Sequence, residues 1–204
     1  MKKAAVRNIS EDLVISVTNT YTPVKNRSHY PHSHDFLELY IHISGEAEYM
    51  VENMIWPIDY GSVVITRENE LHCIRMTEND VLQNVYCGFE RGLFENFAPE
   101  LLSCFDDRAL GQRCVISLPH DMADRCVEKL FEAGRAMDDM TPLGICEGRA
   151  EFMTVLAEVN RVWENEGVFN TTGGVRYNAG SMLAGRALAL INKHCAEIRT
   201  VDDG

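Results

Sequence analysis

The sequence has few basic residues. Nineteen Lys and Arg residues stand against 31 Asp and Glu residues, so the formal net charge of the 204-residue chain is −12. A protein that grips nucleic-acid phosphates needs the opposite sign over at least one face. Because the basic residues are also scattered along the chain, no local basic stripe compensates for the acidic balance. We therefore expect that this chain does not bind DNA by itself.

The sequence also lacks the marks of secretion and of membrane insertion. It has no Cys-x-x-Cys pair, and an odd number of widely spaced cysteines is not a disulfide framework. No apolar stretch near the N-terminus has the length of a signal peptide, and no run approaches the roughly 18 apolar residues of a membrane span. We predict a cytoplasmic protein without a membrane partner. Its cysteines, expected to be reduced and mostly buried, are Cys73, Cys87, Cys104, Cys114, Cys126, Cys146 and Cys195.

The first half of the chain has a β pattern. From Leu13 to Phe89, short β-type runs alternate with turns such as Glu52-Asn53 and Asp59-Tyr60-Gly61. Many short strands at regular spacing are typical of an antiparallel sandwich or barrel, and closing the sheet removes its sticky edges. With 46% hydrophobic residues, the chain can bury one good-sized core and a small helical module.

The second half has helical periodicity. One helix is expected from about Pro119 to Asp138, and another from Pro142 until Gly167 ends it. We assign Trp163, which recurs at helical spacing, to packing. A third helix is expected over residues 183–198, after a short linker. The predicted fold class is therefore mainly β with α, a barrel followed by an α-helical region.

Three candidate ligands share even numbering in one extended segment. From a strand, His32, His34 and Glu38 would point the same way. Two imidazoles and a carboxylate are ligands that a divalent metal ion takes, and His72 is a candidate fourth ligand from a neighbouring strand. This set suits Zn, Ni, Fe or Mn without choosing between them. The alternative is a polar cluster that hydrogen-bonds within the barrel without metal.

The same strand face extends the candidate site. Tyr40 and His42 share the parity of the cluster and can offer a hydroxyl and an imidazole to a small-molecule ligand. Phe36 has this parity too, and we interpret it as barrel filling. The candidate ligand-binding residues are thus His32, His34, Glu38, Tyr40, His42 and His72.

The opposite face of this strand is wholly apolar. Its residues are Leu37, Leu39, Ile41 and Ile43. A barrel exterior that faces water does not need such a face. We expect the helical half, or a second copy of the chain, to cover it.

The spacing of these residues resembles a known motif. His-x-His-x3-Glu-x6-Gly, from His32 to Gly45, is similar to the first cupin motif, and Gly61 to His72 has the residue count of the second. The resemblance implies a cupin-type double-stranded β-helix, or jelly-roll, barrel. The departures are Arg67 in place of a proline, Asn26 and Asn69 in place of glycines, and Met76 in place of an asparagine. Because Asn tolerates the left-handed backbone of glycine, Arg67 is the main departure.

Among cupins, His-Ser-His-Asp-Phe-Leu-Glu-Leu with the later Gly61 and His72 resembles the N-terminal sensing domains of AraC-type transcription regulators. The resemblance implies an effector-binding barrel over 1–117, whose first 20 or so residues are an arm, and a dimerising helical region over 118–198. Residues 199–204 would begin a linker to helix-turn-helix units that we expect to be missing. It further implies a sugar or organic acid effector, a homodimer, and DNA contact only through those missing units.

Two other functions compete with this interpretation. A metal-dependent cupin enzyme, an isomerase or a dioxygenase, would use the three histidines and Glu38 to hold a metal with open positions for substrate. Arg67 and the helical extension count against it, and we predict that the chain is not an enzyme. A sensor of the metal ion itself would need cysteines near the histidines, and only Cys73 is placed so.

Overall fold

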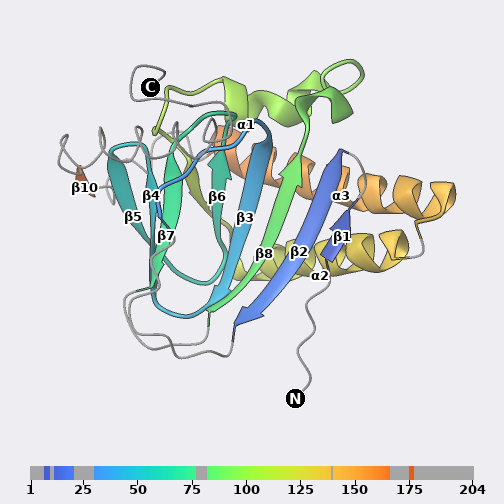
Figure 1. Cartoon of the computed structure of the whole chain (residues 1–204), viewed down its shortest axis with the longest axis horizontal. Helices are drawn as coiled ribbons and strands as arrows, with labels where there is room; N and C mark the ends of the chain where they lie inside the picture. Colours follow the sequence, from blue (N-terminus) through green and yellow to red (C-terminus); the bar gives the residue numbers. More distant parts are fainter. Residues whose placement is uncertain are drawn as a thin grey trace, which may run out of the picture.

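The computed structural model describes residues 7–9, 12–20, 30–76, 82–138, 140–165 and 175–176. Within these residues the strands form two antiparallel sheets (Figure 1). The larger sheet has the order β1 (Arg7–Ile9), β2 (Leu13–Thr20), β8 (Leu82–Phe89), β3 (Leu37–Ser44), β6 (Ser62–Thr66) and β9 (Val115–Ser117). The smaller has the order β10 (Val175–Arg176), β5 (Met54–Ile58), β4 (Ala47–Val51) and β7 (His72–Met76). The prediction of an antiparallel β half is confirmed.

Two long helices follow the sheets. α2 (His120–Met137) begins after Pro119, and α3 (Pro142–Asn165) begins at the second predicted start, so both helix predictions are confirmed. The shorter elements η1 (Arg91–Leu93), η2 (Pro99–Leu102) and α1 (Ser103–Asp106) link β8 to β9, and none of them was predicted from the sequence. None of the described helices is long and apolar enough to cross a membrane. The third predicted helix, over 183–198, lies outside the described residues.

The two helices approach each other closely at Gly148. A Cβ atom there would lie 2.4 Å from Cγ of Met137 and 2.9 Å from the carbonyl oxygen of Ala133. A glycine at this position of α3 therefore lets α2 pack directly against it. Trp163, further along α3, is buried as predicted, and the guanidinium of Arg113 lies 3.8 Å from its ring centroid.

The helices cover the apolar face of the larger sheet (Figure 1). Leu37 and Leu39 of β3 pair with Phe89 and Cys87 of β8, and all four are at most 1% exposed. Phe152 of α3 meets the ring of Phe89 edge-on, with centroids 5.0 Å apart. The expectation that the helical half covers this face is confirmed.

The start of the chain differs from expectation. The family resemblance implies an arm over residues 1 to about 20, whereas β2 pairs with β8 along its whole length, from Leu13 opposite Phe89 to Thr20 opposite Leu82. The alternating residues of β2 supply the reason, because Leu13 and Ile15 are fully buried in the core. Residues 1–6 lie outside the described residues.

Candidate functional site

The site lies between the two sheets. Glu38 comes from the start of β3 in the larger sheet, and His72 is the first residue of β7 in the smaller sheet. His34 precedes β3. The backbone of His32 pairs with that of His72 through hydrogen bonds of 3.0 and 2.9 Å. Side chains from both sheets therefore converge on one point inside the sandwich.

The segment that carries the first ligands is not one continuous strand. The chain bends at Asp35 and Phe36, and the β3 ladder begins only at Leu37. The prediction that one extended strand runs from His32 to Glu38 was therefore wrong, because the bend divides this segment. The bridge between His32 and His72 draws the first part of the segment to the smaller sheet, while β3 stays in the larger one.

Glu38 is the centre of the cluster. Its Oε2 atom lies 2.9 Å from Nε2 of His34 and 3.3 Å from Nε2 of His72, while its Oε1 accepts a 2.7 Å hydrogen bond from the hydroxyl of Tyr49 on β4. The ligand atoms of His34, Glu38 and His72 all lie within 4.8 Å of one another. Glu38 is 3% exposed and His72 is 1% exposed, so water reaches neither carboxylate nor imidazole freely.

The geometry around the two imidazoles fits a metal ion. Nδ1 of His34 donates to the carbonyl of Phe36 at 2.9 Å, and Nδ1 of His72 donates to the carbonyl of Glu70 at 2.8 Å. These bonds fix both rings with Nε2 turned toward Glu38, the arrangement that orients histidines around metals. Nε2 of His72 and the hydroxyl of Thr66 are buried without a hydrogen-bond partner among the described residues. A cation bound to Nε2 would satisfy that nitrogen.

His32 stands at the edge of the cluster. Its ring lies 4.5 Å from that of His72 and 6.2 Å from that of His34, measured between centroids, and its side chain is exposed. It does not belong to the group whose ligand atoms lie within 4.8 Å. Nδ1 donates to the carbonyl of Tyr30 at 3.0 Å, which leaves Nε2 available. Its role as a further ligand stays a prediction.

Tyr40 and His42 form a separate pair. The hydroxyl of Tyr40 donates to Nδ1 of His42 at 3.1 Å, and Nε2 of His42 donates to the carbonyl of Gly45 at 2.7 Å. Burial lowers the pKa of His42, which favours the neutral imidazole that this pattern requires. Both residues face the interior as expected, but they bond to each other rather than to the cluster. Their contact with a ligand stays a prediction.

Electrostatics favour the charged forms of Glu38 and His72. Burial opposes the charged form of Glu38, but the charge of His72 and the hydrogen bond from His34 outweigh burial and lower the pKa of Glu38 well below its usual range. Burial likewise opposes the charged form of His72, but attraction to Glu38 outweighs it and raises the pKa of His72. Burial, followed by the charge of Glu38, raises the pKa of Tyr49. Tyr49 is therefore a neutral donor to a carboxylate.

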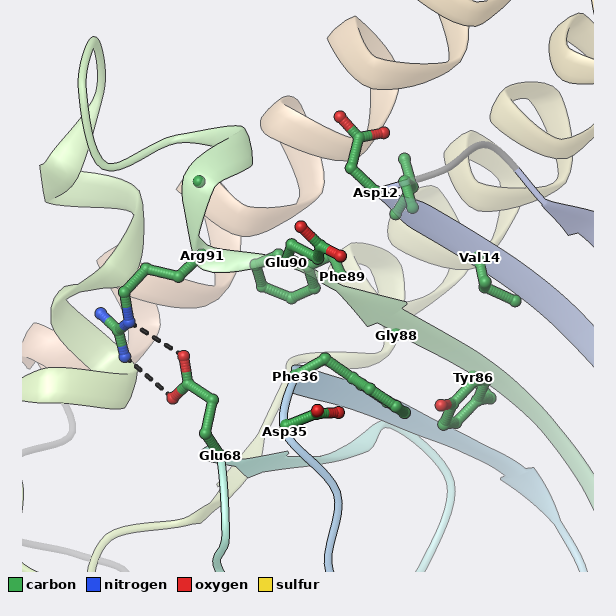
Figure 2. A pocket seen from close by; sticks show the side chains of 12 residues that line it. Asp12, Val14, Asp35, Phe36, Glu68, Tyr86, Gly88, Phe89, Glu90 and Arg91 are labelled. Carbon is green, nitrogen blue, oxygen red and sulfur yellow. Dashed lines mark hydrogen bonds and ion pairs between the residues drawn. The ribbon is translucent and has the colours of Figure 1, made fainter.

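A cavity of about 460 Å³ (Figure 2) is lined by Phe36, whose ring stacks on that of His34 in the cluster. None of the six predicted ligand-binding residues lines it. Phe36 does line it, so the interpretation of Phe36 as mere barrel filling was wrong. The lining residues are Asp12, Leu13, Val14, Asp35, Phe36, Glu68, Tyr86, Gly88, Phe89, Glu90, Arg91 and Gly92. Sequence reasoning missed the rest of this wall because its residues come from separate segments of the chain.

Gly88 forms the floor of this cavity. A Cβ atom there would lie 2.7 Å from the hydroxyl of Tyr86 and 2.9 Å from the ring edge of Phe36. The two aromatic side chains therefore fold over a strand position that has no side chain of its own. A glycine within a strand often marks such a close approach, and this was the available sequence signal.

Two facing antiparallel sheets with a histidine and carboxylate cluster between them define a cupin-type jelly roll. The AraC-like transcriptional activator CuxR matches with a TM-score of 0.51 at 16% identity, covering 93% of this chain and 63% of CuxR. A protein with a double-stranded β-helix domain from Klebsiella pneumoniae matches with a TM-score of 0.36 at 20% identity, covering 43% of this chain and 75% of its own. AerE from Microcystis aeruginosa matches with a TM-score of 0.35 at 15% identity, covering 39% of this chain and 37% of AerE.

The chain belongs to the family of AraC-like ligand binding domains, whose profile matches residues 20–134. A comparison with curated proteins finds no match. The family and fold class predicted from the sequence are confirmed. Membership of this family points to a ligand-sensing domain of a regulator.

Proposed function

We propose that this chain is the effector-binding part of a bacterial AraC-type transcription regulator, and that a small metabolite binds in the cavity over Gly88. The observation that carries the proposal is a cavity of about 460 Å³ inside a domain of this ligand-binding family. Pockets for small molecules have volumes of roughly 300–1,000 Å³. The cavity therefore has room for one metabolite of the size of a sugar.

The position of the cavity supports a sensing role. Tyr86 and Gly88 of β8 line it, while Cys87 of the same strand lies with Leu39 on the face that the helices cover. A ligand that tightens or shifts β8 acts at once on the packing of Phe152 against Phe89. The free energy available for switching is the differential affinity of the effector for two arrangements of the sheet and helices.

We propose that the cluster holds one divalent metal ion through His34, Glu38 and His72, with His32 as a candidate further ligand. Imidazole and carboxylate ligands suit Zn, Ni, Fe or Mn. Three protein ligands would leave open positions, and a metal held there would supply a Lewis acid for carboxylate or hydroxyl oxygens of an effector. The cluster and the cavity share a wall, because the ring of Phe36 stacks on that of His34.

The sequence predicted a sugar or an organic acid as the effector. These two classes need different contacts in the cavity. The hydroxyls of a sugar can donate to the carboxylates of the cavity while its ring lies against Phe36. An organic acid meets those carboxylates with like charge, so it needs a metal ion at the cluster. The cavity lining thus favours the sugar of the two.

The proposed regulator function also implies two partners, a second copy of the chain and DNA. We propose that the helical region, assigned to 118–198, dimerises, and that DNA is bound through a separate domain in the cytoplasm. The exposure of Met140 and Leu143 at the junction of α2 and α3, 49% and 77%, supports a contact there. Light scattering on the purified chain tests the dimer, because a monomer at all concentrations rejects it.

A metal-dependent cupin enzyme is the second candidate function, and the metal-compatible geometry of His34, Glu38 and His72 favours it. It differs from a sensor in one measurable respect. An enzyme converts the small molecule that it binds, whereas a sensor returns the molecule unchanged.

The test is a thermal-shift screen of the chain with sugars and organic acids, each with Mn²⁺ or Zn²⁺ and with a chelator. Wild type and Gly88→Ala are compared, because the added Cβ would clash with Tyr86 and Phe36 and force these cavity-lining side chains to move. We expect compounds that raise the melting temperature of wild type only and that are recovered intact. Metal-dependent turnover of a hit establishes the enzyme instead, and hits that stabilise both proteins equally reject the cavity.

A further inference from the structure

The charged residues of the cavity are mostly acidic. Asp12, Asp35, Glu68 and Glu90 stand against one guanidinium, that of Arg91. Figure 2 shows Asp35 and Phe36 on one side of the hollow, Glu90 and Asp12 on another, and the pair of Glu68 and Arg91 on a third. A ligand in this space is therefore surrounded by carboxylates.

The guanidinium of Arg91 already binds two carboxylates of the protein. Arg91 donates from Nε and Nη2 to Glu68 at 2.9 and 3.0 Å, and from Nη1 to Asp106 at 2.7 Å. These bonds raise its pKa, so it remains charged and paired. Because two carboxylates share this one cation, Arg91 has no full positive charge left for an anionic ligand.

Two of the carboxylates have no cationic partner in the described part of the chain. Asp12 pairs with Arg149 at 2.6 Å, and Glu68 pairs with Arg91. Asp35 and Glu90 are exposed and make no such pair there. Within the described part of the chain, the cavity thus presents two carboxylates that no cation neutralises.

The floor between these carboxylates is aromatic. The ring of Phe36 and the phenol of Tyr86 come together over Gly88. Aromatic faces attract cations, and they also offer apolar surface to a hydrocarbon chain or ring. Carboxylates beside aromatic faces are the combination that recognises an organic ammonium or guanidinium group.

We infer that the cavity selects a small organic cation, with its ammonium or guanidinium group near Asp35 and Glu90 and its apolar part against Phe36 and Tyr86. The inference rests on the proposed function and names the effector class of the same cavity. It departs from the neutral sugar and the organic acid that the sequence suggested. An amino sugar or another primary amine satisfies it.

The experiment uses three probes that share one ring and differ in charge: benzylamine, benzyl alcohol and benzoate. Their dissociation constants are measured by ligand-observed NMR at low ionic strength, where exposed charges act most strongly. The variant is Asp35→Asn with Glu90→Gln, which removes both uncompensated charges at nearly constant shape. The matched control is Asp107→Asn with Glu128→Gln, which removes two exposed charges that do not line the cavity.

We expect wild type and the control to bind benzylamine about tenfold more tightly than benzyl alcohol, because Asp35 and Glu90 attract the ammonium group and not the hydroxyl. Benzoate should bind most weakly. The Asp35→Asn, Glu90→Gln variant should bind the amine and the alcohol about equally. A preference that survives in this variant, or that also disappears in the control, overturns the inference.

Gly88→Ala separates this inference from the proposed function. If all three probes bind wild type equally and none binds Gly88→Ala, the cavity is a ligand site and the inferred charge selection is wrong. If benzylamine binds Gly88→Ala as tightly as wild type, or does not bind wild type at all, the cavity itself is rejected for this ligand class.

Discussion

The ring of Phe36 lies flat on the ring of His34, with centroids 3.7 Å apart and 2° between their planes. His34 belongs to the metal-compatible cluster, and Phe36 forms a wall of the cavity. One aromatic stack therefore joins the two parts of the candidate site. A ring displaced on one side of this stack changes the shape of the other side.

Loss of His72 should abolish metal binding. The metal-compatible group has three ligands, and changes even to residues that merely orient ligands weaken metal sites about 10–100-fold. We expect wild type to bind one Zn²⁺ or Mn²⁺ per chain in calorimetry, and His72→Gln to bind at least about 100-fold more weakly. His120→Gln, on the exposed start of α2, is the control and should bind as wild type. Equal binding by His72→Gln rejects the site.

The stability of the metal-free chain should depend on pH through Glu38 and His72. The pKa of His72 is raised from 6.5, so its contribution is full below 6.5 and is lost as pH rises through the folded pKa. The pKa of Glu38 is lowered from 4.5, so its contribution is present above 4.5 and is lost as pH falls through its folded pKa. Urea titrations with a chelator should therefore show the largest stability difference between wild type and His72→Gln near pH 4.5–6.5. A difference that grows above this window contradicts the pairing.

The sequence predicted the fold better than it predicted the cavity. Period-two alternation in β3, and prolines at both helix starts, are local signals, and they located the sandwich and both described helices. The motif spacing also brought His34, Glu38 and His72 together. Ligand residues that belong to a sequence motif can be predicted, because the spacing between them identifies the motif.

The cavity wall has no such spacing. Asp12 precedes the start of β2, Glu68 follows the end of β6, and Glu90 follows the end of β8. These three residues line one cavity because those strand ends lie at the same side of the larger sheet. The hydrogen bond between Tyr40 and His42 could not be predicted from the sequence either. Even or odd numbering in a strand indicates which face of the sheet a side chain lies on, but not which group it bonds to. Gly88 was the signal that could have been used.

The buried pair of Glu70 and Arg108 should be a main support of the loop before His72. Both side chains are fully buried, and they meet through bonds of 2.6 and 2.8 Å. Arg108→Met leaves a buried carboxylate without its counter-ion, so we expect a loss of about 3–5 kcal/mol in the free energy of unfolding. Lys129→Met, which breaks a half-exposed pair with Glu151, should reduce the free energy of unfolding far less than Arg108→Met does.

A second variant isolates the charge at this position. Glu70→Gln combined with Arg108→Met removes both charges but keeps an oxygen that can accept from the amide of Gly111. Chemical denaturation should show that it regains at least about half of the loss. If the double variant is less stable than Arg108→Met alone, hydrogen bonding rather than charge dominates.

The thiols should differ sharply in reactivity. Cys104 and Cys114 are fully buried, and burial raises the pKa of each to about 12. Cys146 on α3 is exposed. In Cys195→Ser, which removes the cysteine outside the described residues, a thiol reagent at pH 8 should modify one cysteine rapidly. Cys146→Ser in that background should remove the fast phase, and rapid modification of several thiols contradicts the packing.

The central claim is that the effector binds over Gly88 rather than between Tyr40 and His42. The most direct measurement is a crystal structure of the chain with a compound that the thermal-shift screen identifies. We predict electron density for the compound against Phe36 and Tyr86, with its charged group near Asp35 and Glu90. Density in the space around Tyr40 and His42, with the cavity empty, would contradict the claim.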